Sequence, residues 1–172
     1  MPTIFSHTVI PIAIALGARR IPRRLLFAGI AASILPDLDT VGFRFGVAYA
    51  HEFGHRGFTH SLVFALTLAI FAALFAPELR TKRMTASVFI FITTASHGLL
   101  DMFTNGGLGV ALFWPFTDAR YFFPLRMIDV SPIGLRGFLG QAGIRALKSE
   151  LLWVWVPALI LGVAVYLRRR HS

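Results

Sequence analysis

Hydrophobic residues along the chain are grouped into five stretches, separated by short polar or charged segments. The pattern predicts helices at about residues 4–18, 22–35, 58–76, 85–103 and 151–168. A helix needs about 20 residues to cross the hydrocarbon core of a bilayer, with a lower limit near 17. By that measure the last three stretches are long enough to cross. The first two are short, and they suit tilted partial spans, a re-entrant hairpin, or helices buried against the others.

The composition supports a membrane environment for these helices. Hydrophobic residues make up 56% of the 172 residues and charged residues 15%, against about 25% charged residues in a typical soluble domain. A soluble core of this size has no room for so much apolar surface. We therefore expect an all-α, multi-spanning helical membrane protein that forms a single domain over residues 1–172. Because the chain has no cysteine, disulfides, thiolate zinc sites and a cysteine nucleophile are excluded.

The longest region without a predicted span is residues 105–150. It contains several prolines and a dense aromatic run between Phe113 and Phe123. Aromatic side chains gather where a membrane meets water. We therefore expect this region to lie on the bilayer surface as an interfacial, aromatic-rich segment.

The distribution of basic residues predicts an orientation. The net charge is +9, and much of it lies in three clusters at Arg19–Arg24, Arg80–Arg83 and Arg168–Arg170. Because these clusters punctuate apolar runs, membrane topology explains them better than nucleic-acid binding does. If every stretch crosses, all three clusters lie on one side, which the positive-inside rule makes cytoplasmic. The C-terminus would then be cytoplasmic, with His171 solvated in the basic tail, and the N-terminus would lie outside. The basic residues within 105–150 oppose this rule, which long loops obey less strictly.

Histidine and acidic residues gather at the opposite ends of the same helices. Five of the six histidines and four of the eight acidic residues fall on the outer side. They are His7, Asp37, Asp39, His51, Glu52, His55, His60, His97 and Asp101. An ionisable residue within a membrane segment is costly and marks a functional site by default. His51 and Glu52 are the weaker candidates, because both suit a solvated loop.

Two pairs in this group have a spacing that suits metal ligands. His97 and Asp101 are four residues apart on a predicted helix, so both face the same side and can reach one ion. The alternative is a structural hydrogen bond between helices. Asp37 and Asp39 follow Pro36, and hard carboxylate oxygens at this spacing can bridge divalent cations. The alternative for them is solubility at the end of a helix.

The remaining candidates lie around the start of the third stretch and at the N-terminus. The imidazoles of His55 and His60 suit zinc first, with manganese or another divalent metal also possible, although histidines in surface loops are common. His7 suits either a ligand or a helix cap. Arg56 suits either a clamp on a phosphate or a contact with lipid head groups. Together these residues predict a site for one or two divalent ions.

Taken together, the motifs resemble a known family, the inner-membrane-bound metal-dependent hydrolases of the YdjM type, whose members are also described as LexA-binding. The resemblance covers roughly residues 1–135. It rests on the strings Ser6–His7, Leu35–Asp39, His55–Ser61, Ser96–Asp101 and Thr104–Gly107. It implies a multi-spanning membrane protein of bacteria or archaea with a divalent-metal hydrolase activity.

A more distant resemblance is to the all-helical zinc-dependent phospholipase C and nuclease group, in which histidine, aspartate, histidine and a His-x-x-x-Asp helix supply metal ligands in that order. In this chain the order would be His7, Asp37, His55 or His60, and then His97 with Asp101. A second helix of the type His-x-x-x-Glu or His-x-x-x-Asp is missing from the sequence, which favours one or two ions over three.

These observations lead to one functional hypothesis and one rival. The hypothesis is a membrane-bound, metal-dependent hydrolase of the inner membrane, with its site on the outer, periplasmic face. It would cleave a phosphoester or ester bond in a lipid or lipid-linked substrate. Asp39 or His55 would be a bridging ligand or the general base, and Arg56 would stabilise developing charge. The rival is a non-catalytic membrane protein that binds metal or regulates a partner.

Overall fold

The computed structural model describes residues 1–18, 20–132 and 135–170, and these residues are helical apart from loops and two isolated β-bridges. His171, expected to be solvated, lies outside them. The α-helices are α1 (Ile4–Gly17), α2 (Arg23–Ile34), α3 (Leu62–Leu74), α4 (Arg83–Met102), α5 (Leu135–Phe138), α6 (Gln141–Glu150) and α7 (Val156–Arg170). Two 3₁₀ segments, η1 (Leu35–Phe45) and η2 (Phe58–His60), and a π-helical segment, η3 (Leu151–Trp155), complete the helical structure. The all-α prediction is therefore confirmed for the described residues.

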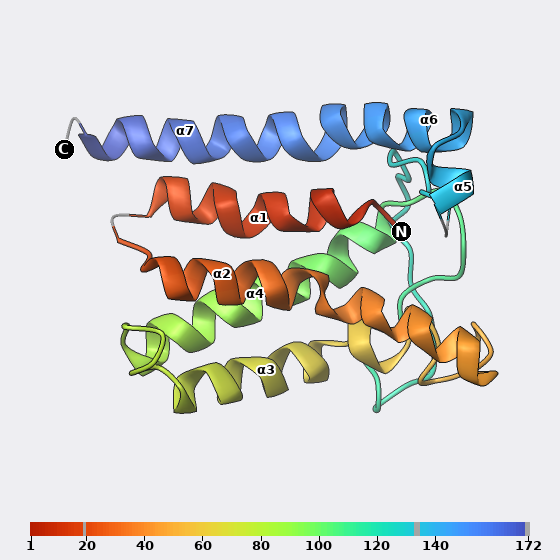
Figure 1. Cartoon of the computed structure of the whole chain (residues 1–172), viewed down its shortest axis with the longest axis horizontal. Helices are drawn as coiled ribbons and strands as arrows, with labels where there is room; N and C mark the ends of the chain where they lie inside the picture. Colours follow the sequence, from red (N-terminus) through yellow and green to blue (C-terminus); the bar gives the residue numbers. More distant parts are fainter. Residues whose placement is uncertain (19, 133–134, 171–172) are drawn as a thin grey trace.

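The long helices form an elongated bundle (Figure 1). Helix α1 packs against α7 on one side and α2 on the other, while α4 crosses the bundle and packs against α2 and α3. The end of α1, the start of α2, the α3–α4 turn and the end of α7 all lie at one end, which carries most of the basic-cluster residues. The N-terminus, η1, η2 and α6 lie at the other end. The predicted separation of basic clusters from the histidine and aspartate residues is thus present in the bundle.

Two helical runs are long and apolar enough to cross a bilayer by length and composition, so the expectation of five spans is not confirmed. The first is Arg23–Phe45, 23 residues long, and the second is Gln141–Arg170, 30 residues long. Helix α3 has only 13 residues, beginning at Leu62 instead of residue 58. Ser61 caps it by accepting a hydrogen bond from the Phe64 amide at 3.1 Å, because this satisfies an N–H group that has no partner within the helix.

Prolines account for two differences from the expected boundaries. The predicted second helix ends at residue 35, but the chain continues past Pro36 as the 3₁₀ segment η1 to Phe45. Proline lacks an N–H group and disturbs the α-helical ladder, so the tighter turn takes over until Gly46, at φ 80°, ends it. Similarly, the π-helical segment η3 comes just before Pro157. It joins α6 to α7 in one helical run that begins at Gln141. Residues 141–150 of the predicted interfacial segment therefore belong to this last helix.

The remaining part of the predicted interfacial segment folds over the end of the bundle opposite the basic clusters. Single bridges pair Thr104 with Ile128 and Val110 with Tyr121. The Leu62 amide donates to the Leu112 carbonyl at 3.0 Å. These contacts tie the segment to the ends of α4 and α3, so it covers the region where the histidines and aspartates lie.

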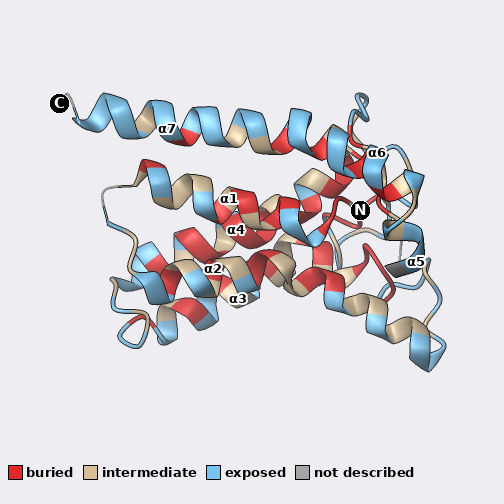
Figure 2. Cartoon of the chain, turned by 45° about the horizontal axis from the view of Figure 1, so that its top comes forward, coloured by how far each residue is buried: buried red, intermediate tan, exposed pale blue. Residues whose placement is uncertain are grey.

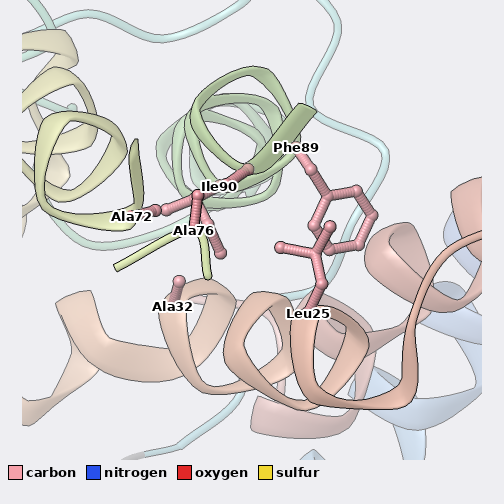
Figure 3. Packing of buried hydrophobic residues seen from close by; sticks show 7 residues of the cluster. Leu25, Ala32, Ala72, Ala76, Phe89 and Ile90 are labelled. Atoms are coloured by element: carbon pink, nitrogen blue, oxygen red, sulfur yellow. The ribbon is translucent and has the colours of Figure 1, made fainter. Parts of the chain in front are cut away.

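Small residues let the helices pack closely at the centre of the bundle. Figure 3 shows Leu25 and Ala32 of α2 facing Phe89 and Ile90 of α4. A Cβ atom at Gly29 would lie 2.3 Å from the Phe89 ring, so glycine makes room for this ring. By contrast, many large apolar side chains are exposed along the helices, whose exposed positions are pale blue in Figure 2. An apolar exterior of this extent is expected where lipid surrounds a protein.

Candidate metal centre

Seven of the predicted site residues come from four separate segments and meet at one end of the bundle. Their side chains are almost fully shielded from solvent, with Asp37 the most exposed at 4%. They are His7 of α1, Asp37 and Asp39 of η1, His55 and His60 around η2, and His97 and Asp101 of α4. The convergence expected from topology is therefore present in the structure.

The centre of the group is formed by three histidines and one aspartate. His60 Nε2 lies 3.1 Å from His97 Nε2. Asp37 Oδ1 lies 3.3 Å from His97 Nε2 and 3.9 Å from His60 Nε2. The His7 ring stacks on the His97 ring with centroids 3.6 Å apart, and His7 Nε2 is 4.0 Å from Asp37 Oδ2. Nitrogen and oxygen atoms that bind cations are thus crowded together away from solvent.

Hydrogen bonds at the other ring nitrogen set the tautomers of His97 and His60. His97 Nδ1 lies 2.7 Å from the Ser33 carbonyl oxygen, which can only accept, so Nδ1 carries the proton. The Thr59 hydroxyl donates to Asp39 Oδ2, so the same hydroxyl oxygen can accept from His60 Nδ1 at 3.1 Å. In each neutral ring, Nε2 is left with a free lone pair that points into the group. Metal-binding histidines are commonly fixed in this way.

Asp39 occupies a different place from the one predicted for a ligand. Its Oδ1 accepts from His55 Nδ1 at 2.7 Å, and its Oδ2 accepts from Thr59 and lies 3.3 Å from His60 Nδ1. The two oxygens therefore contact Nδ1 of the His55 ring and Nδ1 of the His60 ring, which leaves Nε2 of each ring on the opposite side. His55 Nε2, on the far side of its ring, is buried and has no hydrogen-bond partner. The arrangement favours Asp39 as the group that orients His55 and His60.

Arg56 is fully buried, and its nitrogens contact groups of the chain itself. Nε lies 3.0 Å from Asp101 Oδ2. One terminal nitrogen donates to the carbonyls of Gly106 and Leu108, and the other donates to the Thr104 hydroxyl. Its backbone has φ 65°, a left-handed conformation that is uncommon for residues other than glycine. These contacts favour a role in holding Asp101 in place over direct contact with a substrate.

The polar atoms that lack partners test whether this group suits a metal ion. Both nitrogens of His7, Nε2 of His55, both carboxylate oxygens of Asp37 and Oδ1 of Asp101 are buried without a hydrogen bond in the described part of the chain, while Asp101 Oδ2 is ion-paired with Arg56. Leaving a buried polar atom unpaired costs about 1–3 kcal/mol, so this many at one point calls for a ligand. A divalent cation fits this donor set of imidazole and carboxylate.

Three overlapping sets of side chains bring their ligand atoms within 4.8 Å of one another. They are His7, Asp37 and His97; Asp37, His55 and His60; and His60, His97 and Asp101. Because the sets share members, neighbouring ions would have to share ligands, as in two-metal sites. Six of the seven predicted ligands belong to at least one set, and Asp39 belongs to none.

His60, which lies in η2 before the start of α3, has a raised pKa. Burial alone would lower the pKa of His60, but the Asp101 and Asp39 carboxylates outweigh burial and raise it to about 9. Below that pH the imidazolium form is favoured when no ion is bound. Since a cation needs the neutral ring, a bound metal and this proton compete for one position.

Several residues that shape the site were not identified in the sequence. A Cβ atom at Gly98 would lie 2.6 Å from the His60 carbonyl oxygen, so glycine allows η2 to approach α4 beside His97. Ser33 contributes through its carbonyl, which no side-chain pattern signals. Glu150 is fully buried and accepts from the Thr3 amide at 2.6 Å and from the hydroxyls of Thr3 and Ser6. The signal in the sequence that could have identified Glu150 is its position directly before the apolar stretch that begins at Leu151.

The weaker candidates lie apart from the group. His51 is exposed, and its Nδ1 accepts a hydrogen bond from the Phe53 amide. Glu52 is also exposed and accepts from the Trp114 indole N–H at 3.2 Å. Neither belongs to a set of possible ligands, which makes His51 a useful control in experiments on the other histidines.

Comparison with known proteins agrees with the motifs. The family described as "YdjM inner membrane protein" matches residues 1–171. The chain is 43% identical to "Inner membrane protein YbcI" of Escherichia coli K12 over 99% of this chain and 100% of that protein. It is also 31% identical to "Uncharacterized protein YvsG" of Bacillus subtilis 168, over 62% of this chain and 66% of that protein. No solved structure matches the chain significantly.

Proposed function

The chain belongs to the YdjM family of inner membrane proteins, and we propose that it is a membrane-bound, metal-dependent hydrolase. The observation that carries the proposal is the pair of facing Nε2 atoms of His60 and His97, 3.1 Å apart, next to the unpaired carboxylate of Asp37. The substrate class that suits this location is a phosphoester or ester of a lipid or lipid-linked molecule. Zinc is the preferred ion, with manganese as an alternative.

The residues divide into ligands and groups that orient them. His7, Asp37, His60, His97 and Asp101 would hold one or two ions. When bound, such an ion would supply a lowered pKa of coordinated water and stabilisation of negative charge on substrate oxygens. His55 either completes the ligand set or accepts a proton from the attacking water, and Asp39, 2.7 Å from its Nδ1, fixes the ring for either role.

The location of the site suits a substrate drawn from the membrane. The group lies at the end of the bundle opposite the basic clusters, so the positive-inside rule places it towards the periplasm and the C-terminus in the cytoplasm. Helix α1 has 14 residues and is therefore about 21 Å long, shorter than the hydrocarbon core of about 30 Å. The site would then be sunk partway into the bilayer, where the aromatic residues between Phe113 and Phe123 would meet acyl chains.

A second candidate function follows from the burial of the ligands. Because the His7, His60, His97 and Asp101 side chains have no exposed area, a substrate can reach them only if the covering segment moves. A site that stays closed would make the protein a non-catalytic metal-binding or regulatory membrane protein. The two candidates share the metal and differ in whether a bond is cleaved.

One experiment separates them. Protein purified in neutral detergent is stripped with a chelator, reloaded with zinc or manganese, and assayed for release of products from phospholipids and from a chromogenic phosphodiester. The hydrolase proposal expects metal-dependent turnover that is lost in Asp37→Asn and His55→Ala and kept in His51→Ala. Metal uptake without turnover would favour the non-catalytic protein, and turnover that survives chelation would contradict both.

A further inference from the structure

A groove runs between α1 and α7, in the half of the bundle that lies away from the metal centre. It has a volume of about 350 Å³ and a lining that is almost wholly apolar. On α1 the lining residues run from Ile10 to Ala18, and on α7 they run from Ala158 to Arg169. Arg169 is the one charged residue in the lining. A groove of this volume falls in the range of small-ligand sites in proteins.

The length of the groove matches one leaflet of a bilayer. The eleven steps from Ala158 to Arg169 correspond to about 16 Å along the helix axis at 1.5 Å per residue. The hydrocarbon core is about 30 Å thick, so the groove extends over about half of it. It begins at the end of the bundle that carries the basic clusters. An acyl chain of a lipid in that leaflet would therefore fit along its length.

The charge at this end suits an anionic head group. Arg169 lies in the last turn of α7 together with Arg168 and Arg170, and one of its terminal nitrogens donates to the Gly17 carbonyl at the end of α1. Arg20, also exposed, follows α1. Among the described residues, Glu78, between α3 and α4, is the one acidic residue at this end of the bundle, so little negative charge opposes a phosphate there.

We propose that this groove is a binding site for an anionic phospholipid, with one acyl chain lying along the contact between α1 and α7 and the phosphate beside Arg169. The site is separate from the metal centre and does not depend on any hydrolase activity. Its occupant would bridge α7 to the rest of the bundle, because α7 packs mainly against α1. Juxtamembrane basic residues attract anionic lipids in this way.

The test compares phosphatidylglycerol with phosphatidylcholine of the same acyl chains. Purified protein in neutral detergent is incubated with each lipid, and retained lipid is counted by native mass spectrometry. Each arginine near the phosphate is expected to favour phosphatidylglycerol by about fivefold. Ala158→Trp fills the groove and should lower retention of both lipids. Arg169→Gln should lower this preference by about fivefold while an acyl chain still binds.

Matched controls make the outcome specific to the groove. Ala164 is exposed on α7 outside the lining, so Ala164→Trp should leave retention unchanged. Arg136→Gln, at the metal-site end, should leave the preference unchanged. Equal retention of the two lipids by the wild type would overturn the proposal. So would an unchanged preference in Arg169→Gln, or a change of oligomeric state in Ala158→Trp that identifies the groove as a contact between copies.

Discussion

His60 Nε2 and His97 Nε2 lie 3.1 Å apart in the interior of the protein. The other ring nitrogen of each histidine already faces a hydrogen-bond acceptor, the Thr59 hydroxyl for His60 and the Ser33 carbonyl for His97. Two unprotonated nitrogens at this distance would repel each other, so either a proton or a cation must lie between or beside them. Several tests follow from this relationship and from the contacts that maintain it.

The first prediction concerns the proton on His60. Because its pKa is raised to about 9 when no metal ion is bound, the ring is protonated at pH 7.5, and zinc must displace that proton to bind. Metal uptake at pH 7.5 should release about one proton more than uptake at pH 9.5. Calorimetric titration of stripped protein in buffers of different ionisation enthalpy measures this number. Equal proton release at both pH values would show that His60 is not a ligand.

Gly98→Ala should separate the two histidines without removing either. The new Cβ atom would lie 2.6 Å from the His60 carbonyl oxygen, so η2 must move away from α4. We expect zinc affinity to fall about 10- to 100-fold, as is typical when the support of a metal ligand is disturbed. Gly42→Ala is the matched control, since its Cβ would lie 3.4 Å from Val47, an ordinary contact. Competition with a chromogenic chelator measures the zinc affinity of both variants. If Gly98→Ala bound zinc as tightly as Gly42→Ala, the close packing of η2 on α4 would be contradicted.

Arg56→Met should destabilise the whole site end of the bundle. The substitution leaves Asp101 without its 3.0 Å partner and removes donors to Gly106, Leu108 and Thr104. Loss of one member of a buried ion pair typically costs about 3–5 kcal/mol. The unfolding midpoint in detergent should therefore fall clearly.

The control for this substitution is Arg44→Met, at an exposed arginine of η1, which should change the midpoint little. If Arg56→Met kept the wild-type midpoint and lost only catalytic turnover, Arg56 would contact the substrate instead of supporting Asp101.

Glu150→Gln tests how the last helix is fastened to the site. Glu150 accepts hydrogen bonds from Thr3 and Ser6, directly before His7. An amide offers one acceptor oxygen where the carboxylate has two, so a buried donor loses its partner at a cost of about 1–3 kcal/mol. We expect a lower unfolding midpoint and weaker zinc binding. Glu78→Gln makes the same change at an exposed position and should alter neither the unfolding midpoint nor zinc binding. If the two variants behaved equally, Glu150 would have no role in supporting the site.

The sequence was sufficient to predict the helical class and which histidines and aspartates converge. The continuous apolar stretches located the helices, and the positions of basic residues indicated which helix ends meet. Because His7, Asp37, His60 and His97 lie near the same ends, their convergence followed from topology. The family resemblance at these motifs agrees with the family match over residues 1–171.

What the sequence could not provide depends on contacts between distant parts of the chain. The role of Asp39 depends on which ring nitrogens it faces, and that depends on how η1 lies against η2. The contacts of Arg56 come from residues about 50 positions later in the chain. The length of the second helix was underestimated because Pro36 changes the type of helix instead of ending it, and hydropathy alone does not distinguish these outcomes.

The most direct test of the metal centre is the metal content of purified protein, measured by elemental analysis. We predict one to two zinc or manganese ions per chain in the wild type and in His51→Ala, in which an exposed histidine outside the group is removed. His97→Ala, which removes a shared member of two ligand sets, should retain much less than one. Wild-type protein without metal, or equal metal content in His97→Ala and His51→Ala, would contradict the account.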